Sequence, residues 1–472
     1  MSTWNTSNVT NMAAMCQRCQ SLITFDVSNW NTENVTDVRA IFNYCCVLPT
    51  LNVSNWNTSK FASLYLAFQQ CNALTTLDVS KWDVGNVTDM QNAFRGCCAL
   101  KELDVSKWNT SKVTNMNSMF SSGGDYGDKG LTLKTLDVSN WDVSNVTDMG
   151  WMFYGMNVPS GSSGYKRKLN LSKWNPKKVT SFHHFTAHAY IDFEDGVADW
   201  DVSSCKSFCA MFHTCKSEEL DLSKWDVSSG ESFEMMFKYS GLQKIKGLEN
   251  WDTSNGKTFE EMFCSCPSLV ELDLSNFDTR NATYDWIDPI REEQGMIIHG
   301  SMNRMFGVDT NKYWNLKKIS LGENFSFNGD GTVTVNAVLP APNEAKIPGA
   351  DGKWYTLDGT TYAPADIPNR TAATYYASID VMDINYLADH PTLLRLASTV
   401  RSITDNTKQM KLSEMKEELD VILTEAQTQS DLIAEIQNTL KFKAGGGSGE
   451  ELYNEGIEVG KQRAYDEFWD SY

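Results

Sequence analysis

The feature that most constrains this chain is a repeat of about 26 residues that fills its first two-thirds. One aromatic residue anchors each copy. The anchors are Trp4, Trp30, Trp56, Trp82, Trp108, Trp141, Trp174, Trp200, Trp225, Trp251 and Phe277. They lie 26 residues apart, except for one step of 25 and two of 33. Both longer steps contain a Gly/Ser-rich insertion, at 121–130 and 156–164, which we expect to protrude as a loop from an otherwise unaltered copy.

Two segments of each copy predict its local structure. The stretch L-x-x-L-D-V-S-x-W alternates and is rich in β-forming residues, which predicts one short strand per copy. The following V-T-x-M-x-x-M-F places apolar residues at i, i+3, i+6 and i+7, which predicts a helical turn. Because such a unit cannot bury its apolar edge alone, the copies must stack with their strands in parallel. The predicted fold class is an α/β repeat, an open leucine-rich-repeat-like solenoid of about eleven copies over residues 1–325.

Stacking of similar copies also predicts columns of like side chains in the core. One slot holds an aromatic column, whose members include Phe42, Phe68, Phe94, Phe120, Phe153, Phe212 and Phe263. A second slot holds Cys19, Cys45, Cys71 and Cys97. These thiols could form disulfides or a thiolate metal site. We favour small buried side chains that fit beneath the aromatic column, because Ser or Gly fills the slot in other copies.

The repeat pattern LDVSxWDTSxVTxMxxMFxxCxxL resembles that of the BspA-like leucine-rich repeat surface proteins of bacteria. The resemblance covers residues 4 to about 325, with weaker copies at 174–190 and 230–250 and an insertion near 284–300. It implies a surface-displayed protein that binds host matrix or other cells through its repeats. No particular ligand follows from it.

The sequence after the repeats predicts three further segments. Residues 326–378 combine strand-like runs with Pro and Gly, and we expect a small β-rich cap there. The side chains expected to cover the last copy are Trp354, Tyr355 and Tyr362. Residues 379–443 are expected to be helical, and 444–472 to hold a Gly linker and a terminal helix.

Apolar residues in the expected helical segment alternate at steps of four and three. They are Met415, Leu419, Ile422, Ala426, Ile433, Ile436 and Leu440, with Gln429 as the single polar position. This seam predicts a coiled coil and a homo-oligomer, with a trimer favoured; a lone helix packed on its own domain is the alternative. The stretch LASTVRSITDNTKQMKLSEMKEELDVI and the end LYNEGIEVGKQRAYDEFWDSY also resemble tail and fibre proteins of phages that infect Gram-positive gut bacteria. Together the resemblances imply display on a bacterial cell surface or a phage virion.

Charge and hydropathy exclude several classes of partner. The formal net charge of −19 disfavours nucleic acid and anionic membranes. The sequence contains no stretch of 18 apolar residues, so we expect no membrane insertion. Its start has neither the basic nor the apolar region of a signal peptide. The 12 cysteines, if they are free thiols, indicate a reducing or anaerobic setting.

Side chains suited to catalysis or to cofactor binding are few. His183, His184 and His188 could face one way like metal ligands, but no HExxH or CxxC framework accompanies them, and we favour a decayed copy with partly exposed histidines. The Asp and Asn residues beside the anchors could coordinate calcium, but we favour capping of the adjacent turn. We therefore expect no catalytic residue, no cofactor and no metal site.

Two functions fit these observations. The favoured one is a non-enzymatic binding or structural protein whose partner is a protein or glycan on a host or cell surface. The alternative is an enzyme or regulator that docks its substrate on the repeats and carries its activity in residues 326–472.

Overall fold

A computed structural model of the chain describes residues 4–123, 133, 135–156, 167–193, 196–289, 292, 299–307, 314–332, 337–357 and 360–381. The chain divides into two compact units. The first, called the repeat unit below, comprises Met1–Leu316, Ser320–Pro340 and Pro368–Ala372. The second comprises Lys317–Ile319, Ala341–Ile367 and Ala373–Tyr472.

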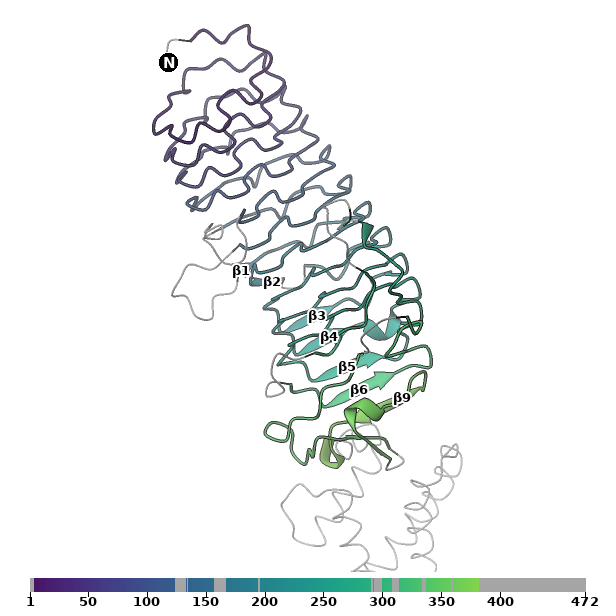
Figure 1. Cartoon of the computed structure of the whole chain (residues 1–472). Coiled ribbons are helices and arrows are strands. Elements are labelled where there is room, and N and C mark those ends of the chain that lie inside the picture. The colour runs from purple at the N-terminus through teal and green to yellow at the C-terminus, as the bar shows by residue number, and fades with distance from the viewer. Residues whose placement is uncertain are drawn as a thin grey trace, which may run out of the picture. The chain divides into compact units, whose positions relative to one another are not determined.

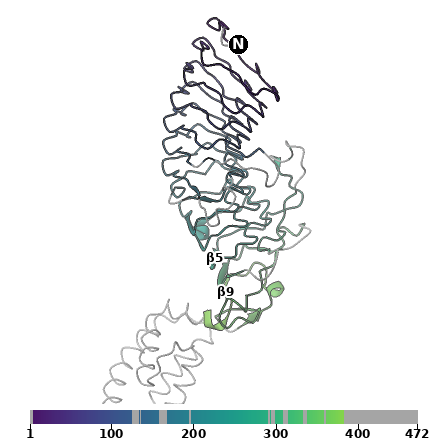
Figure 2. The same ribbon diagram turned by 90° about the vertical axis from the view of Figure 1, so that its left-hand side faces the viewer.

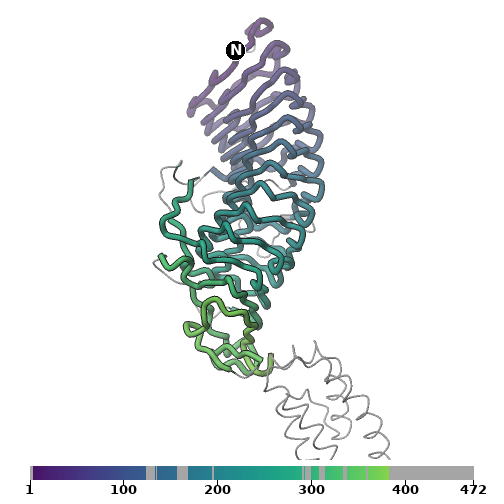
Figure 3. Tube along the Cα trace, turned by 90° about the vertical axis from the view of Figure 1, so that its right-hand side faces the viewer, coloured from purple at the N-terminus to yellow at the C-terminus, as the bar shows by residue number. Residues whose placement is uncertain are grey.

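Successive copies in the repeat unit lie side by side in the order of the sequence (Figure 1). Single-residue parallel bridges join them. One row of bridges runs through Asn11, Asp37, Ser63, Asp89, Asn115, Asp148, Ser181, Ser207, Ser232 and Thr258. This row crosses both 33-residue steps without a break, so the insertions leave the register of the copies unchanged. Views turned by 90° to either side show the same succession of copies (Figures 2 and 3).

The segment expected to form a helical turn consists of consecutive β-turns. In the copy around Phe94, every second backbone N–H donates to the carbonyl three residues back, as that of Ala93 does. The N–H groups between them donate to the next copy, as Phe94 does to the carbonyl of Met119 at 3.0 Å. Asn92 and Gly96 have positive φ angles of 57° and 76° and occupy the third position of their turns, as in type II turns.

Positive φ angles four residues apart recur in other copies, so the same pair of turns is rebuilt along the unit. The pairs are Ala40 and Tyr44, Leu66 and Gln70, His184 and His188, Ala210 and Thr214, Met235 and Tyr239, and Glu261 and Ser265. Two such turns bring inward the same i, i+3 and i+7 side chains that a helical turn would. The expected inward residues are therefore buried without a helix: Val113, Met116, Met119 and Phe120.

Within the described residues of the repeat unit, strands are short and occur only in the later copies. They pair in parallel as β1 (Arg167–Lys168) with β2 (Ile191–Asp192), and as β3 (Glu219–Asp221) with β4 (Lys244–Lys246). The elements that follow are η1 (Leu248–Asn250), a 3-10 helix, and the strands β5 (Glu271–Leu274) and β6 (Lys318–Leu321). In the described copies before β1, the same segment makes single bridges, such as that of Thr50 with Thr76.

The second unit contains a small antiparallel arrangement. Strand β7 (Trp354–Tyr355) pairs with β8 (Thr361–Tyr362) and with β9 (Ala373–Tyr376), and η2 (Pro364–Asp366) is a 3-10 helix. Trp354 is fully buried, and the ring of Tyr362 packs edge-on against that of Tyr375. The three aromatic residues expected in the cap thus belong to β7 and β8.

The predicted fold class is wrong. The described residues of the repeat unit form turns, single bridges and strands of two to four residues, not the α/β leucine-rich-repeat-like solenoid that we expected. No helical coiled-coil tail is seen in the described residues either, and the seam from Met415 to Leu440 lies outside them, as does the whole chain from residue 382 on. Within the described residues, no helix is long and apolar enough to cross a membrane.

Candidate functional site

The predicted aromatic column lies in the core of the repeat unit. Its named members are at most 1% exposed: Phe42, Phe68, Phe94, Phe120, Phe153, Phe212 and Phe263. From Phe42 to Phe153 the rings stack at centroid distances of 5.6 to 5.9 Å. Phe185, which the sequence reasoning missed, continues this column with its ring edge-on to Phe153 at 5.3 Å. These rings contact one another inside the unit, so they contribute to stability and not to an exposed binding surface.

The anchor tryptophans form a second column, which the sequence reasoning used only as a marker of the period. Trp30, Trp56 and Trp82 stack at 6.1 Å between ring centroids. The indole N–H of Trp82 donates to the carbonyl of Val53 at 3.2 Å, and the same bond recurs for each anchor from Trp56 to Trp251. A buried tryptophan thereby gains its hydrogen-bond partner from the neighbouring copy.

Three of the four predicted thiols are buried, whereas Cys19 is exposed. The thiols of Cys45, Cys71 and Cys97 each donate to a backbone carbonyl 29 residues earlier, at 3.2 Å. Burial raises the pKa of Cys45 to about 12, and it also raises the pKa of Cys71 and of Cys97. None of the 12 cysteines, all of which lie in the described residues, forms a disulfide. Cys45, Cys71 and Cys97 therefore pack as protonated side chains that satisfy backbone carbonyls.

The Asp and Asn residues beside the anchors cap turns. Asp78 Oδ1 accepts hydrogen bonds from the backbone N–H and the hydroxyl of Ser80, at 3.1 and 2.7 Å. Asp104 makes the same two contacts with Ser106. These hydrogen bonds hold the pKa of both carboxyl groups below its usual range. The carboxylates therefore serve the local turn, which is the role that we favoured over calcium binding.

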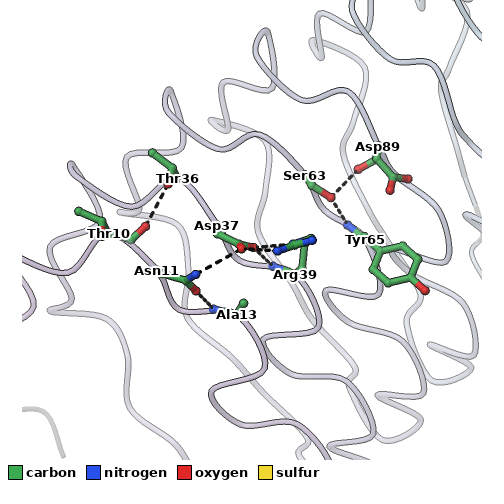
Figure 4. A network of polar contacts seen from close by, with 9 residues as sticks. All are labelled: Thr10, Asn11, Ala13, Thr36, Asp37, Arg39, Ser63, Tyr65 and Asp89. Atoms are coloured by element: carbon green, nitrogen blue, oxygen red, sulfur yellow. Dashed lines mark hydrogen bonds and ion pairs between the residues drawn. The ribbon is translucent and has the colours of Figure 1, made fainter.

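A row of polar side chains follows the bridges on the outside of the copies (Figure 4). We call it the polar face and define it by Thr10, Asn11, Thr36, Asp37, Arg39, Ser63, Tyr65, Thr88, Asp89, Gln91, Thr114, Asn115, Asn117, Thr147 and Asp148. These side chains are exposed or partly exposed. Each bridging side chain of the polar face accepts the backbone N–H two residues later, as Asn11 does from Ala13 at 2.7 Å and Ser63 from Tyr65 at 3.0 Å.

Hydrogen bonds also link the polar face within and between copies. The hydroxyl of Thr36 donates to the carbonyl of Thr10 at 3.2 Å, and Asn117 Nδ2 donates to the Asp148 carboxylate at 3.1 Å. The guanidinium of Arg39 contacts both carboxylate oxygens of Asp37, at 3.0 and 2.8 Å, and holds the pKa of that carboxyl low. Hydroxyl, amide and carboxylate groups are thus held in fixed orientations along the row.

The three histidines singled out in the sequence separate into two places. His183 and His184 lie together, with ring centroids 4.3 Å apart. The ring of His188 lies 4.5 Å from that of His213 in the following copy. Burial lowers the pKa of His213 to about 3, with His188 and Lys238 acting in the same direction. This ring is therefore neutral at physiological pH.

One family model matches the repeat region. It is described as "Mycoplasma protein of unknown function, DUF285", and it matches residues 1–76, 62–158, 161–244 and 242–285, which together make up more than half of the chain. No curated protein and no solved structure matches the chain. The tandem matches confirm the prediction of a repeat protein, and they are not specific to BspA-like or phage tail proteins. The chain therefore belongs to the repeat family described as DUF285.

Proposed function

We propose that the chain is a non-enzymatic binding protein, displayed on a bacterial cell surface or a phage virion, that recognises a surface glycan with its polar face. The observation that carries the proposal is the recurrence of hydroxyl, amide and carboxylate groups one copy apart along that face. A polymer of repeating sugars contacts such a row at several copies at once. Weak contacts then add up to useful affinity.

Capping prepares the polar face for binding. Ser63, Asp89 and Asn115 each accept a backbone N–H from the residue two positions later, at 2.9 to 3.0 Å. Their side chains are therefore already ordered before a ligand arrives. Association then costs less side-chain entropy than it would with free rotamers, which are worth about 0.5–1.5 kcal/mol each.

The chemistry of the polar face suits an uncharged or cationic glycan. Asp37, Asp89 and Asn115 offer acceptors and donors to sugar hydroxyls, and the partly exposed ring of Tyr65 offers an apolar surface beside them. The net charge of −19 repels acidic polysaccharides. We therefore favour neutral sugar polymers over anionic ones.

Association of several chains is part of the proposal, with a homotrimer favoured. The resemblances to BspA-like surface proteins and to phage tail proteins support display, and multivalency raises avidity without new contacts. The positions proposed for self-association, 415–440, lie outside the described residues, so this step rests on the sequence alone. Light scattering on the full chain tests it, and a monomer at micromolar concentration contradicts it.

A glycan array that also carries host matrix proteins tests the ligand class. We expect the full chain to bind neutral or cationic glycans and to ignore acidic ones. Binding only to matrix proteins, or to no ligand, contradicts the proposal.

A matched pair of double variants then locates the binding surface. Tyr65→Ala with Gln91→Ala alters the polar face, and Lys81→Ala with Lys107→Ala alters exposed residues next to the anchor tryptophans. We expect the first pair to weaken glycan binding at least tenfold and the second to leave it unchanged. Equal losses in both pairs contradict the assignment of the polar face.

A further inference from the structure

A separate observation concerns the later copies, where metal-binding side chains meet. Two imidazole nitrogens and one thiol sulfur, from His183, His184 and Cys209, lie within 4.8 Å of one another. We propose that these three residues bind a transition-metal ion of the zinc class. Imidazole and thiolate are the donors that zinc prefers, and three protein ligands are sufficient for a site with one open position.

Stacking explains why the three residues meet. Ser181 and Ser207 are bridging partners in adjacent copies, and His183 and Cys209 each lie two residues after their bridge. The two ligands therefore occupy the same slot, one copy apart. In the polar face this slot holds Tyr65 and other polar residues.

Backbone hydrogen bonds fix the ligand-bearing segments. The N–H of His184 donates to the carbonyl of Cys209 at 2.7 Å, which ties two of the ligands together. The backbone carbonyl of His183 accepts a hydrogen bond from the N–H of Trp151 at 2.8 Å. The backbone N–H of His183 donates to the hydroxyl of Ser181 at 3.2 Å. The ligands are thus held close before a metal binds, which is the preorganisation that a metal site needs.

The distances suit a tetrahedral site. Zinc binds nitrogen at about 2.0–2.1 Å and thiolate at about 2.3 Å, which places tetrahedral donors roughly 3.5 Å apart. Since the three donors already lie within 4.8 Å of one another, side-chain rotations are sufficient to bring them into place.

The surroundings of the three ligands are largely closed to solvent. Cys209 is fully buried and His183 is buried, while the half-buried His184 borders the solvent and provides the entry path. The ring of Trp151 lies 4.9 Å from that of His183 and 5.2 Å from that of His184. Ala187 and Ala210 pack with the cysteine in the same cluster. Exclusion of water strengthens the attraction between a divalent cation and a thiolate.

The sequence grouped three histidines that the structure separates. His183, His184 and His188 attract attention because they are close in sequence, but His188 pairs with His213 instead. Cys209 comes from the next copy and is one of twelve cysteines. This makes His188→Gln a matched control, because it removes a nearby histidine that is not among the three ligands.

Metal titration of the full chain tests the site. The probes are Zn²⁺ alone in equilibrium dialysis, and Co²⁺ alone, whose absorption reports thiolate ligation and tetrahedral geometry. We expect one ion per chain, a thiolate-to-cobalt charge-transfer band, and a higher melting temperature with Zn²⁺, since a ligand that binds only the folded state stabilises it.

Three variants separate the outcomes. Cys209→Ser is expected to abolish the charge-transfer band, and His184→Gln to weaken binding at least tenfold, while His188→Gln keeps both stoichiometry and spectrum. His184→Gln alters a half-buried residue and provides a second test if the fully buried Cys209 does not tolerate substitution. Failure of the native chain to bind one ion overturns the proposal, as does a cobalt spectrum that Cys209→Ser leaves unchanged. Because no glycan is present, this result is independent of the proposed glycan binding.

Discussion

In the copies between Trp30 and Phe120, the outer slot two residues after each bridge holds Arg39, Tyr65, Gln91 or Asn117. In the copies between Trp174 and Cys266, the same slot holds His183, Cys209, Glu234 or Glu260. The backbone hydrogen bonds beneath the slot are alike: Asn92 donates to the carbonyl of Asn117, and Ala210 donates to that of Glu234. The two regions thus share one pattern of turns and differ in the chemistry that they present.

The comparison teaches where this repeat tolerates change. The inner slots must keep apolar side chains because they contact equivalent residues above and below. The outer slot is partly exposed at Tyr65 and Gln91 and buried at His183 and Cys209, yet the turns beneath it are the same, so it accepts a polar residue, a histidine or a cysteine without disturbing them. Function is therefore expected to reside in the outer slot and stability in the columns.

The largest expected effect is alkaline unfolding, which should affect both regions. Burial raises the pKa of Cys45 and of Cys266 to about 12 from an ordinary value of 9.0, and that of Cys215 to about 11. Because the folded pKa is the higher one, the stability from these thiols is fully present below pH 9 and is lost as the pH rises towards 12. Circular dichroism between pH 8 and pH 12 should show cooperative loss of structure, and retention of the fold at the highest pH contradicts the burial of these thiols.

The next largest effect is expected from the aromatic column. The ring of Phe94 is fully buried and stacks on Phe68 and Phe120 at 5.6 and 5.8 Å, so Phe94→Ala should cost about 3–5 kcal/mol of unfolding free energy. Phe185→Ala in the later region should cost a similar amount, because its ring is also fully buried. Urea denaturation measures both values. A small cost for Phe185→Ala alone would mean that the later copies do not rely on this column.

Acid should lower the stability of the later copies through His213, a contribution that the earlier copies lack. The pKa of His213 is lowered to about 3 from 6.5, so its contribution to stability is present above pH 6.5 and is lost as the pH falls towards 3. At pH 5 the loss amounts to about 2 kcal/mol, since each pH unit below 6.5 costs about 1.4 kcal/mol. His213→Gln should flatten this part of the pH profile of unfolding, and an unchanged profile contradicts the assignment to His213.

The smallest of these effects is expected at the cysteine slot. Cys71→Ser keeps a donor for the carbonyl of Phe42 but places a more polar group in an apolar site, which should cost about 1 kcal/mol. Thermal unfolding of Cys71→Ser and of Phe94→Ala, measured side by side, tests whether the first costs less stability than the second. A cost for Cys71→Ser that equals that of Phe94→Ala contradicts a packing role for the thiol.

The period and the columns could be predicted from the sequence because each slot is marked by one residue type, as Phe94 and Trp82 mark theirs. The helical turn could not be excluded, because consecutive β-turns bury the same spacing of apolar residues as one helical turn. The distinguishing signal is a positive φ angle at residues such as Asn92 and Ser118, which sequence composition does not encode.

The candidate metal ligands show a second limit of sequence reasoning. His183 and Cys209 are 26 residues apart, and they meet only because the bridge of Ser181 with Ser207 aligns their slots. A sequence pattern can locate such a pair once the outer slot is known, by comparing positions one period apart. Residue spacing within a single copy cannot locate such a pair, because the two residues belong to different copies.

Hydrogen exchange tests most directly the claim that one set of turns underlies both regions. The backbone N–H groups of Asn92 and Phe94 donate to the next copy at 2.9 and 3.0 Å. Those of Ala210 and Phe212 do so at 2.8 and 2.9 Å. We predict that all four amides exchange at similarly slow rates in the native chain, as hydrogen bonds between stacked copies require. Rapid exchange at Ala210 and Phe212 with slow exchange at Asn92 and Phe94 would show that the later copies have lost the common backbone, and would contradict the account.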